Sequence, residues 1–198
     1  MGGMTGPKRE AMLVLRAQSG DLDALDRLLR GVQWPLFRYI RGIVDQDELA
    51  EDVLQNVLIL ICRKLRWLRE PRFFRAWAFR VASREALRSA RRERSRLDRT
   101  STADSVEAVA AGATHALAAA AENPEPLDRI EAARLLERLD SLPPASRAVL
   151  LLHYQEEMSL SEVADVMEIP LGTAKSRLAY GLERLRKSVP RGNDPSAQ

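Results

Sequence analysis

The chain of 198 residues is long enough for one or two small domains, and its 45% of hydrophobic residues suffices for compact cores. A single cysteine, Cys62, excludes a disulfide framework and a cysteine-based metal site, and it suits a reducing compartment such as the cytoplasm. The first ten residues lack the apolar core of a signal peptide, and no apolar run approaches the roughly 18 residues of a membrane span, so we expect a cytoplasmic protein without membrane insertion.

The net charge is only +3, but it is unevenly distributed. Residues 63–99 hold 14 basic and four acidic side chains, a net of +10, whereas the rest of the chain carries a net of −7. A basic block inside an otherwise acidic protein indicates a polyanionic partner such as a nucleic acid.

Helical periodicity predicts three short helices at the start of the chain. The first covers residues 10–18 and stops before Gly20. Asp21 caps the second, which ends at Gly31. The third begins around Pro35, because proline is tolerated in a first turn. The whole pattern predicts an all-α protein.

A longer helix is predicted over residues 45–68. Acidic side chains crowd its start and basic ones its end, which complements the helix dipole. Its apolar stripe is broad, and Ile59 and Leu60 widen it beyond one core face. That surplus indicates either a partner protein or a neighbouring helix of the same domain.

The next predicted helix follows a break at Pro71 and covers residues 73–96. It combines aromatic residues with a ridge of arginines at three- and four-residue spacings: Arg80, Arg84, Arg88, Arg91 and Arg92. The aromatic residues either form a core or stack on single-stranded bases beside neutralised phosphates. The pattern alone leaves both interpretations open.

Residues 97–126 form a predicted flexible linker that is rich in alanine and acidic overall. A second helical domain is predicted over residues 127–189. Its end reads as two helices joined by a turn. Ser159 or Ser161 caps the first helix, Pro170 breaks it and Thr173 caps the second. The outer face of the second helix suits a major-groove reader, although a merely solvated hairpin has a similar pattern.

Three motif blocks resemble the sigma factors of RNA polymerase, in the small extracytoplasmic-function group. They are LAEDVLQNVL (49–58), FFRAWAFRVASREALRSARR (73–92) and the stretch of residues 139–189 that contains GTAKSRL. The resemblance covers residues 10–96 and 127–189. It implies two helical domains joined by a linker, the second with a helix-turn-helix, and a non-enzymatic factor without cofactor or metal.

The resemblance also implies partners and positions. Core RNA polymerase would be bound by Glu48, Glu51, Asp52, Gln55 and Asn56. The single-stranded minus-ten element would be held by Arg69, Arg72, Phe73, Phe74, Trp77, Arg80, Arg84, Arg88, Arg91 and Arg92. The double-stranded minus-thirty-five element would be read by Thr173, Lys175, Ser176, Arg177, Ala179, Tyr180 and Arg184. An anti-sigma protein is implied as a regulatory partner.

Three positions depart from the family pattern. Arg84 stands where asparagine is usual, Glu168 where glycine is common, and Asn56 where an acid is usual. Two other functions compete with the resemblance. A stand-alone helix-turn-helix regulator would need only the second domain. A metal-dependent nuclease would need the acidic residues from Asp45 to Asp52 as ligands, but no nucleophile, phosphate loop or Cys/His cluster accompanies them.

Overall fold

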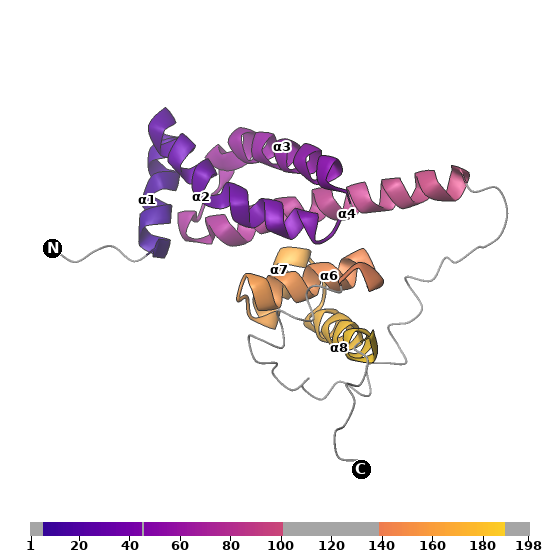
Figure 1. Cartoon of the computed structure of the whole chain (residues 1–198). Helices are drawn as coiled ribbons and strands as arrows, with labels where there is room; N and C mark the ends of the chain where they lie inside the picture. The colour runs from indigo at the N-terminus through magenta and orange to yellow at the C-terminus, as the bar shows by residue number, and fades with distance from the viewer. Residues whose placement is uncertain (1–5, 45, 101–138, 189–198) are drawn as a thin grey trace, which may run out of the picture.

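The computed structural model describes residues 6–44, 46–100 and 139–188, and these residues form helices without any β-strand (Figure 1). The predicted all-α fold is therefore confirmed for the described part of the chain. Its elements are α1 (Gly6–Gln18), α2 (Leu22–Arg41), α3 (Asp47–Lys64), η1 (Leu65–Trp67), η2 (Pro71–Phe73), α4 (Phe74–Thr100), η3 (Leu139–Ser141), α6 (Pro144–Leu150), η4 (Leu151–Gln155), α7 (Leu160–Met167) and α8 (Leu171–Ser188).

The turn between α1 and α2 follows the sequence signals. Gly20 has a φ of +96°, a conformation that glycine adopts without steric cost. The carboxylate of Asp21 then accepts a hydrogen bond of 2.9 Å from the backbone N–H of Ala24, so Asp21 is the N-cap of α2, as predicted.

Helix α2 continues through Gly31 and Pro35, so the predicted break between two separate helices is wrong. The proline ring removes one helical hydrogen bond and disfavours the preceding turn. Buried side chains on both sides of the proline offset this cost, because they form one continuous stripe: Leu28, Val32, Leu36, Tyr39 and Ile40.

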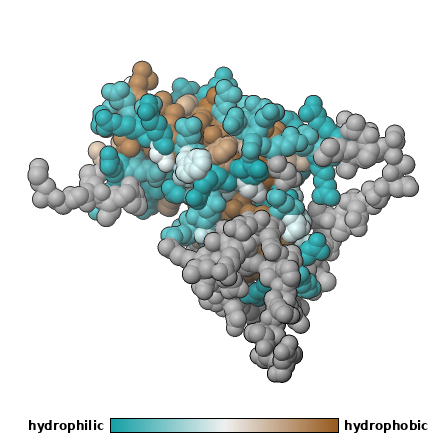
Figure 2. Space-filling model, viewed as in Figure 1, coloured by the Kyte–Doolittle hydropathy of each residue, from teal (hydrophilic) through white to brown (hydrophobic). Residues whose placement is uncertain are grey.

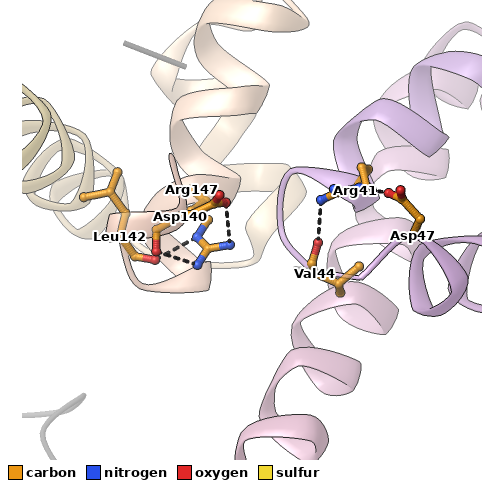
Figure 3. A network of polar contacts seen from close by, with 6 residues as sticks. All are labelled: Arg41, Val44, Asp47, Asp140, Leu142 and Arg147. Carbon is orange, nitrogen blue, oxygen red and sulfur yellow. Dashed lines mark hydrogen bonds and ion pairs between the residues drawn. The ribbon is translucent and has the colours of Figure 1, made fainter. Parts of the chain in front are cut away.

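Helix α3 is shorter than predicted and gives way to the 3₁₀ turn η1 at Leu65. Its start is tied to the end of α2 by Arg41, whose side chain donates to the Asp47 carboxylate and, at 3.5 Å, to the carbonyl of Val44 (Figure 3). Helix α3 then packs alongside α2.

The core of the first group of helices, α1 to α4, contains an aromatic pair contributed by α2 and α4. The rings of Tyr39 and Phe79 meet edge to face with centroids 5.3 Å apart. The Tyr39 hydroxyl lies 2.6 Å from the Ser83 hydroxyl, which donates to the carbonyl of Phe79. Burial raises the pKa of Tyr39, so this side chain is a neutral hydrogen-bonding core residue.

The second group, η3 to α8, is held at its start by a buried arginine. Nε of Arg147 donates to the carbonyl of Leu142 at 2.7 Å, and Nη2 donates to the carbonyl of Asp140 at 3.1 Å (Figure 3). Both carbonyls belong to the turn before α6, and the buried cation is thereby satisfied.

The helix-turn-helix is formed by α7 and α8. Of the two predicted caps, Ser159 and Ser161, Ser159 is the N-cap of α7, and it completes a capping box with Glu162. Thr173 does not cap α8. The helix begins earlier, at Leu171, because the carbonyl of Pro170 accepts from the backbone N–H groups of Thr173 and Ala174.

The two groups of helices pack against each other, with α7 and α6 lying along α4 (Figure 1). Buried residues of both groups belong to one core cluster. At Gly42 the backbone approaches closely, since an added Cβ would lie 2.6 Å from Cδ1 of Leu151. The predicted linker beyond residue 100 and the predicted helix before residue 139 lie outside the described residues.

Candidate nucleic-acid interface

The five residues predicted to bind polymerase lie on one exposed face of α3. Beside this face, a groove of about 650 Å³ runs between α2 and α3, and Asp52 and Gln55 form part of its wall. The opposite wall carries Trp34, which is exposed and stacks on Phe37 with ring centroids 5.8 Å apart. The sequence prediction did not include Trp34. Its position outside the buried stripe of α2 is a signal that its side chain is exposed. The face therefore combines acidic groups with an exposed aromatic side chain, and aromatic residues are the type enriched at protein interfaces.

Apolar residues also reach the surface on the face of the first group shown in Figure 2, where they interrupt the polar covering. Ile59 is 46% exposed, so the described structure does not bury it against a neighbouring helix. Burial by a neighbouring helix therefore does not account for Ile59 in the described structure, and a contact with a partner protein stays a prediction.

The segment between α3 and α4 presents two exposed aromatic rings. Trp67 is 61% exposed with the guanidinium of Arg66 at 4.0 Å from its ring centroid, and Phe73 is 52% exposed with that of Arg72 at 4.7 Å. Exposed rings beside cations are suited to stacking on unpaired bases next to phosphates. Trp67 was missed by the sequence prediction, but its position beside Arg66 and Arg69 is a usable signal.

The other aromatic residues of this region belong to the interior. Phe74 and Phe79 are fully buried, and Trp77 is half-buried and packs against the core. Phe74 therefore leaves the predicted DNA-contacting set, because its ring faces core side chains in the described structure. The core interpretation is thus confirmed for Phe74 and Phe79, whereas base stacking by the exposed rings stays a prediction.

The arginine ridge of α4 is exposed at Arg88, Arg91 and Arg92. Two of its members face α7 instead. Arg84 is paired with Glu168, and Arg80 is half-buried, with a buried Nε that has no hydrogen-bond partner in the described structure. The C-terminal part of the ridge is therefore exposed, whereas its N-terminal part lies against α7.

The outward residues of α8 have mixed accessibility. Arg184 is exposed, whereas Thr173, Lys175, Ser176, Arg177, Ala179 and Tyr180 are half-buried. The Ser176 hydroxyl donates to the carbonyl of Thr173 at 3.0 Å. Burial, and to a lesser extent the nearby guanidinium of Arg91, lowers the pKa of Arg177. The guanidinium groups of Arg91 on α4 and Arg177 on α8 are therefore near enough to repel each other.

Two further observations concern membranes and metals. None of the helices in the described part of the chain is both long and apolar enough to cross a membrane. Within residues 6–44, 46–100 and 139–188, no cluster of three or more His, Cys, Asp or Glu side chains is arranged to hold a metal ion.

Comparisons with known proteins match both groups of helices. Residues 28–96 match the family model of sigma-70 region 2, and residues 138–187 match that of sigma-70 region 4. The RNA polymerase sigma-H factor of Pseudomonas aeruginosa is 31% identical over 190 residues, which cover 94% of this chain and 96% of that protein. The ECF RNA polymerase sigma-E factor of Escherichia coli K12 is 28% identical over 182 residues, which cover 91% and 94%.

Solved structures share the fold. The sigma factor RpoE from Bartonella quintana, solved in complex with the anti-sigma factor NepR, superposes with a TM-score of 0.58 at 21% identity, covering 82% of this chain and 94% of that one. The likeness supports the helical architecture of both groups.

Proposed function

This chain belongs to the sigma-70 family of RNA polymerase sigma factors, and from that premise we propose how its surfaces are divided between polymerase and promoter. As a sigma factor it is a non-enzymatic initiation factor that binds core RNA polymerase and directs it to promoter DNA. The family names of its relatives place it with the extracytoplasmic-function group.

The exposed acidic face of α3 is the proposed contact with core polymerase. Glu48, Glu51, Asp52, Gln55 and Asn56 would form its polar part, and Trp34 in the adjoining groove would supply an aromatic anchor. An exposed tryptophan beside carboxylates suits a basic, amphipathic partner surface.

The minus-ten element would be captured where α3 meets α4. Unpaired bases would stack on Trp67 and Phe73, and their phosphates would meet Arg66, Arg69 and Arg72. The backbone would then follow the arginines of α4. Capture by stacking supplies about 1–3 kcal/mol per base, which lets a duplex be held open without nucleotide hydrolysis.

The minus-thirty-five element would be read by α8 in the major groove. Lys175, Ser176, Ala179 and Tyr180 would face base edges, with Arg177 and Arg184 on phosphates. Thr173 would lie in the first turn of this helix, where its backbone N–H is already bonded to Pro170.

An anti-sigma factor is the proposed regulator, since a structural neighbour with the same fold was solved with one. The cytoplasm is the proposed location, because core polymerase and the chromosome are there. The chain would be held inactive until the regulator is removed.

The observation that carries the assignment of the first group is the pair of exposed aromatic–arginine stacks beside α4, because a stand-alone helix-turn-helix regulator has no use for them. The test is in-vitro transcription with purified core polymerase on a promoter library, together with co-purification of the chain and core. We expect promoter-specific transcripts only when the chain is present. Promoter binding without core, together with no association with core, would favour the stand-alone regulator.

A further inference from the structure

The contact between α4 and α7 is fastened by a bidentate ion pair. Nε of Arg84 lies 2.9 Å from one carboxylate oxygen of Glu168, and Nη2 lies 2.5 Å from the other. The side chains are 61% and 44% exposed, so water reaches both partners. The geometry is specific, but the pair is accessible enough to exchange for another anion.

Glu168 holds this position at a conformational cost. It follows α7 with φ +53° and ψ +47°, the left-handed conformation that glycine tolerates far better than glutamate. Its side chain then points to α4, where hydrogen bonding with Arg84, and less strongly the charges of Arg84 and Arg80, lower the pKa of its carboxyl. The two positions singled out in the sequence, 84 residues apart, are thus one contact.

Other features of the same contact oppose closure. The buried Nε of Arg80 donates no hydrogen bond within the described part of the chain, and an unsatisfied donor is unfavourable. Arg91 and Arg177 bring like charges together from α4 and α8. Separation of the two groups would rehydrate Arg80 and relieve this repulsion.

We propose that the Arg84–Glu168 pair is an intramolecular lock that keeps α7 on the arginine ridge of the free chain and competes with the phosphates of single-stranded DNA for that ridge. The lock rests on the proposed role of α4 in holding DNA. Glu168 acts as a substitute anion, and opening releases Arg80 and Arg84 together. Because the pair is exposed, its loss should change the ratio of closed to open chain by roughly two- to fivefold.

The first test measures the distance between the groups, independently of DNA. Spin labels on the native Cys62 of α3, which is exposed, and on E183C of α8 report this distance in the full chain. We expect E168G and R84N to increase the population at long distances. The exchanged pair R84E/E168R should restore the short distances, and D165N, which removes an exposed charge from α7 without touching Arg84, should leave them unchanged. Identical distributions in all variants would overturn the lock.

We expect α7 to remain folded in E168G, since glycine accepts the left-handed conformation of this position. Circular dichroism checks that its helical content equals that of the unsubstituted chain. If E168G loses helical content, the distance measurement is repeated with E168Q, which removes the charge and keeps a side chain of the same size.

The second test measures the affinity for a fluorescent oligothymidine of about 16 nucleotides, which spans the ridge. E168G should tighten binding about two- to fivefold and D165N by less, since only the former frees arginines. R88A/R91A tests the ridge separately. Longer distances in E168G with no effect of R88A/R91A on affinity would overturn the DNA role of the ridge and keep the lock. An affinity that falls in R88A/R91A but does not rise in E168G would overturn the competition.

Discussion

The carboxylate of Glu156 lies 2.7 Å from Nη2 of Arg75, although the two residues are 81 positions apart in the chain. The Glu156 side chain is only 2% exposed, and Arg38 of α2 approaches its other oxygen at 3.8 Å. A buried carboxylate depends on such partners because water no longer solvates it. Glu156 of the second group of helices therefore places a negative charge between Arg38 and Arg75 of the first group.

We predict an asymmetry between the two partners of this pair. R75A should lower the free energy of unfolding by about 2–3 kcal/mol, since it leaves the buried carboxylate with the more distant Arg38 and a 3.2 Å hydrogen bond from the Gln155 side-chain amide. E156Q should cost about 1 kcal/mol or less, because the two arginines are half-exposed and regain water. Urea denaturation followed by tryptophan fluorescence measures both. A larger loss of unfolding free energy in E156Q than in R75A would contradict this account of the Glu156 contacts.

The capping box of α7 should make stability depend on pH. Hydrogen bonds from the side chain and backbone of Ser159 hold the pKa of Glu162 below its usual value. Since the pKa is lower in the folded state, the contribution is present above the unfolded pKa of about 4.3 and is lost as the pH falls below it. S159A should cost about 1 kcal/mol at neutral pH and less in acid. Denaturation at both pH values checks this, and an equal loss at each would count against it.

Local signals predicted some elements and misled at others. The sequence predicts Asp21 as a cap and Ser159 as one of two candidate caps, because an N-cap depends on residues within three positions. The break at Gly31 and Pro35 was wrong because burial of Leu36 and Ile40 outweighs the helix-breaking tendency of a proline. Thr173 was a good cap by type, but Pro170 already supplied the carbonyl that begins α8.

The candidate site divides in the same way. Periodicity alone predicts the arginine ridge of α4, whereas the acidic set on α3 follows from the resemblance to sigma factors. Periodicity could not show that Glu168 forms an ion pair with Arg84, because that contact depends on how the two groups of helices pack against each other. Periodicity also could not distinguish the buried Phe74 from the exposed Phe73. The two residues are neighbours, and the turn between η2 and α4 decides which ring enters the core.

Reversal of charge at Asp52 should abolish binding to core polymerase. Asp52 lies on the exposed acidic face of α3 and in the wall of the groove that contains Trp34, so lysine would meet a basic partner surface with the wrong sign. Pull-down of core by the D52K chain measures the loss, with helical content checked by circular dichroism. D23K, an equal charge change on the exposed surface of α2, should retain core. Core retained by D52K would remove this face from the interface.

Removal of two exposed cations from the ridge should flatten the salt dependence of DNA binding. R88A/R91A deletes two proposed phosphate contacts, and each contact to a single strand contributes about 0.7 to the slope of log affinity against log salt, so the slope should fall by about 1.4. Titrations of oligothymidine at several salt concentrations measure it. R63A/K64A deletes two exposed cations of α3 and should leave the slope unchanged. A slope that is equal in both variants and the unsubstituted chain would place the phosphates elsewhere.

Lys175 and Arg184 should respond differently to truncation, because one is proposed to face bases and the other phosphates. K175A should cost about 1–3 kcal/mol at the preferred upstream sequence and relax the choice of base at one position, since a lost base-edge contact affects only the sequences that used it. R184A, which removes an exposed cation from the C-terminal half of α8, should weaken all sequences alike and lower the salt slope. Competition among upstream-element variants, with the chain bound to core polymerase, distinguishes the two patterns. Uniform weakening in K175A would make Lys175 a backbone contact, and a sequence-dependent loss in R184A would move the base-reading surface of α8 toward its C-terminal end.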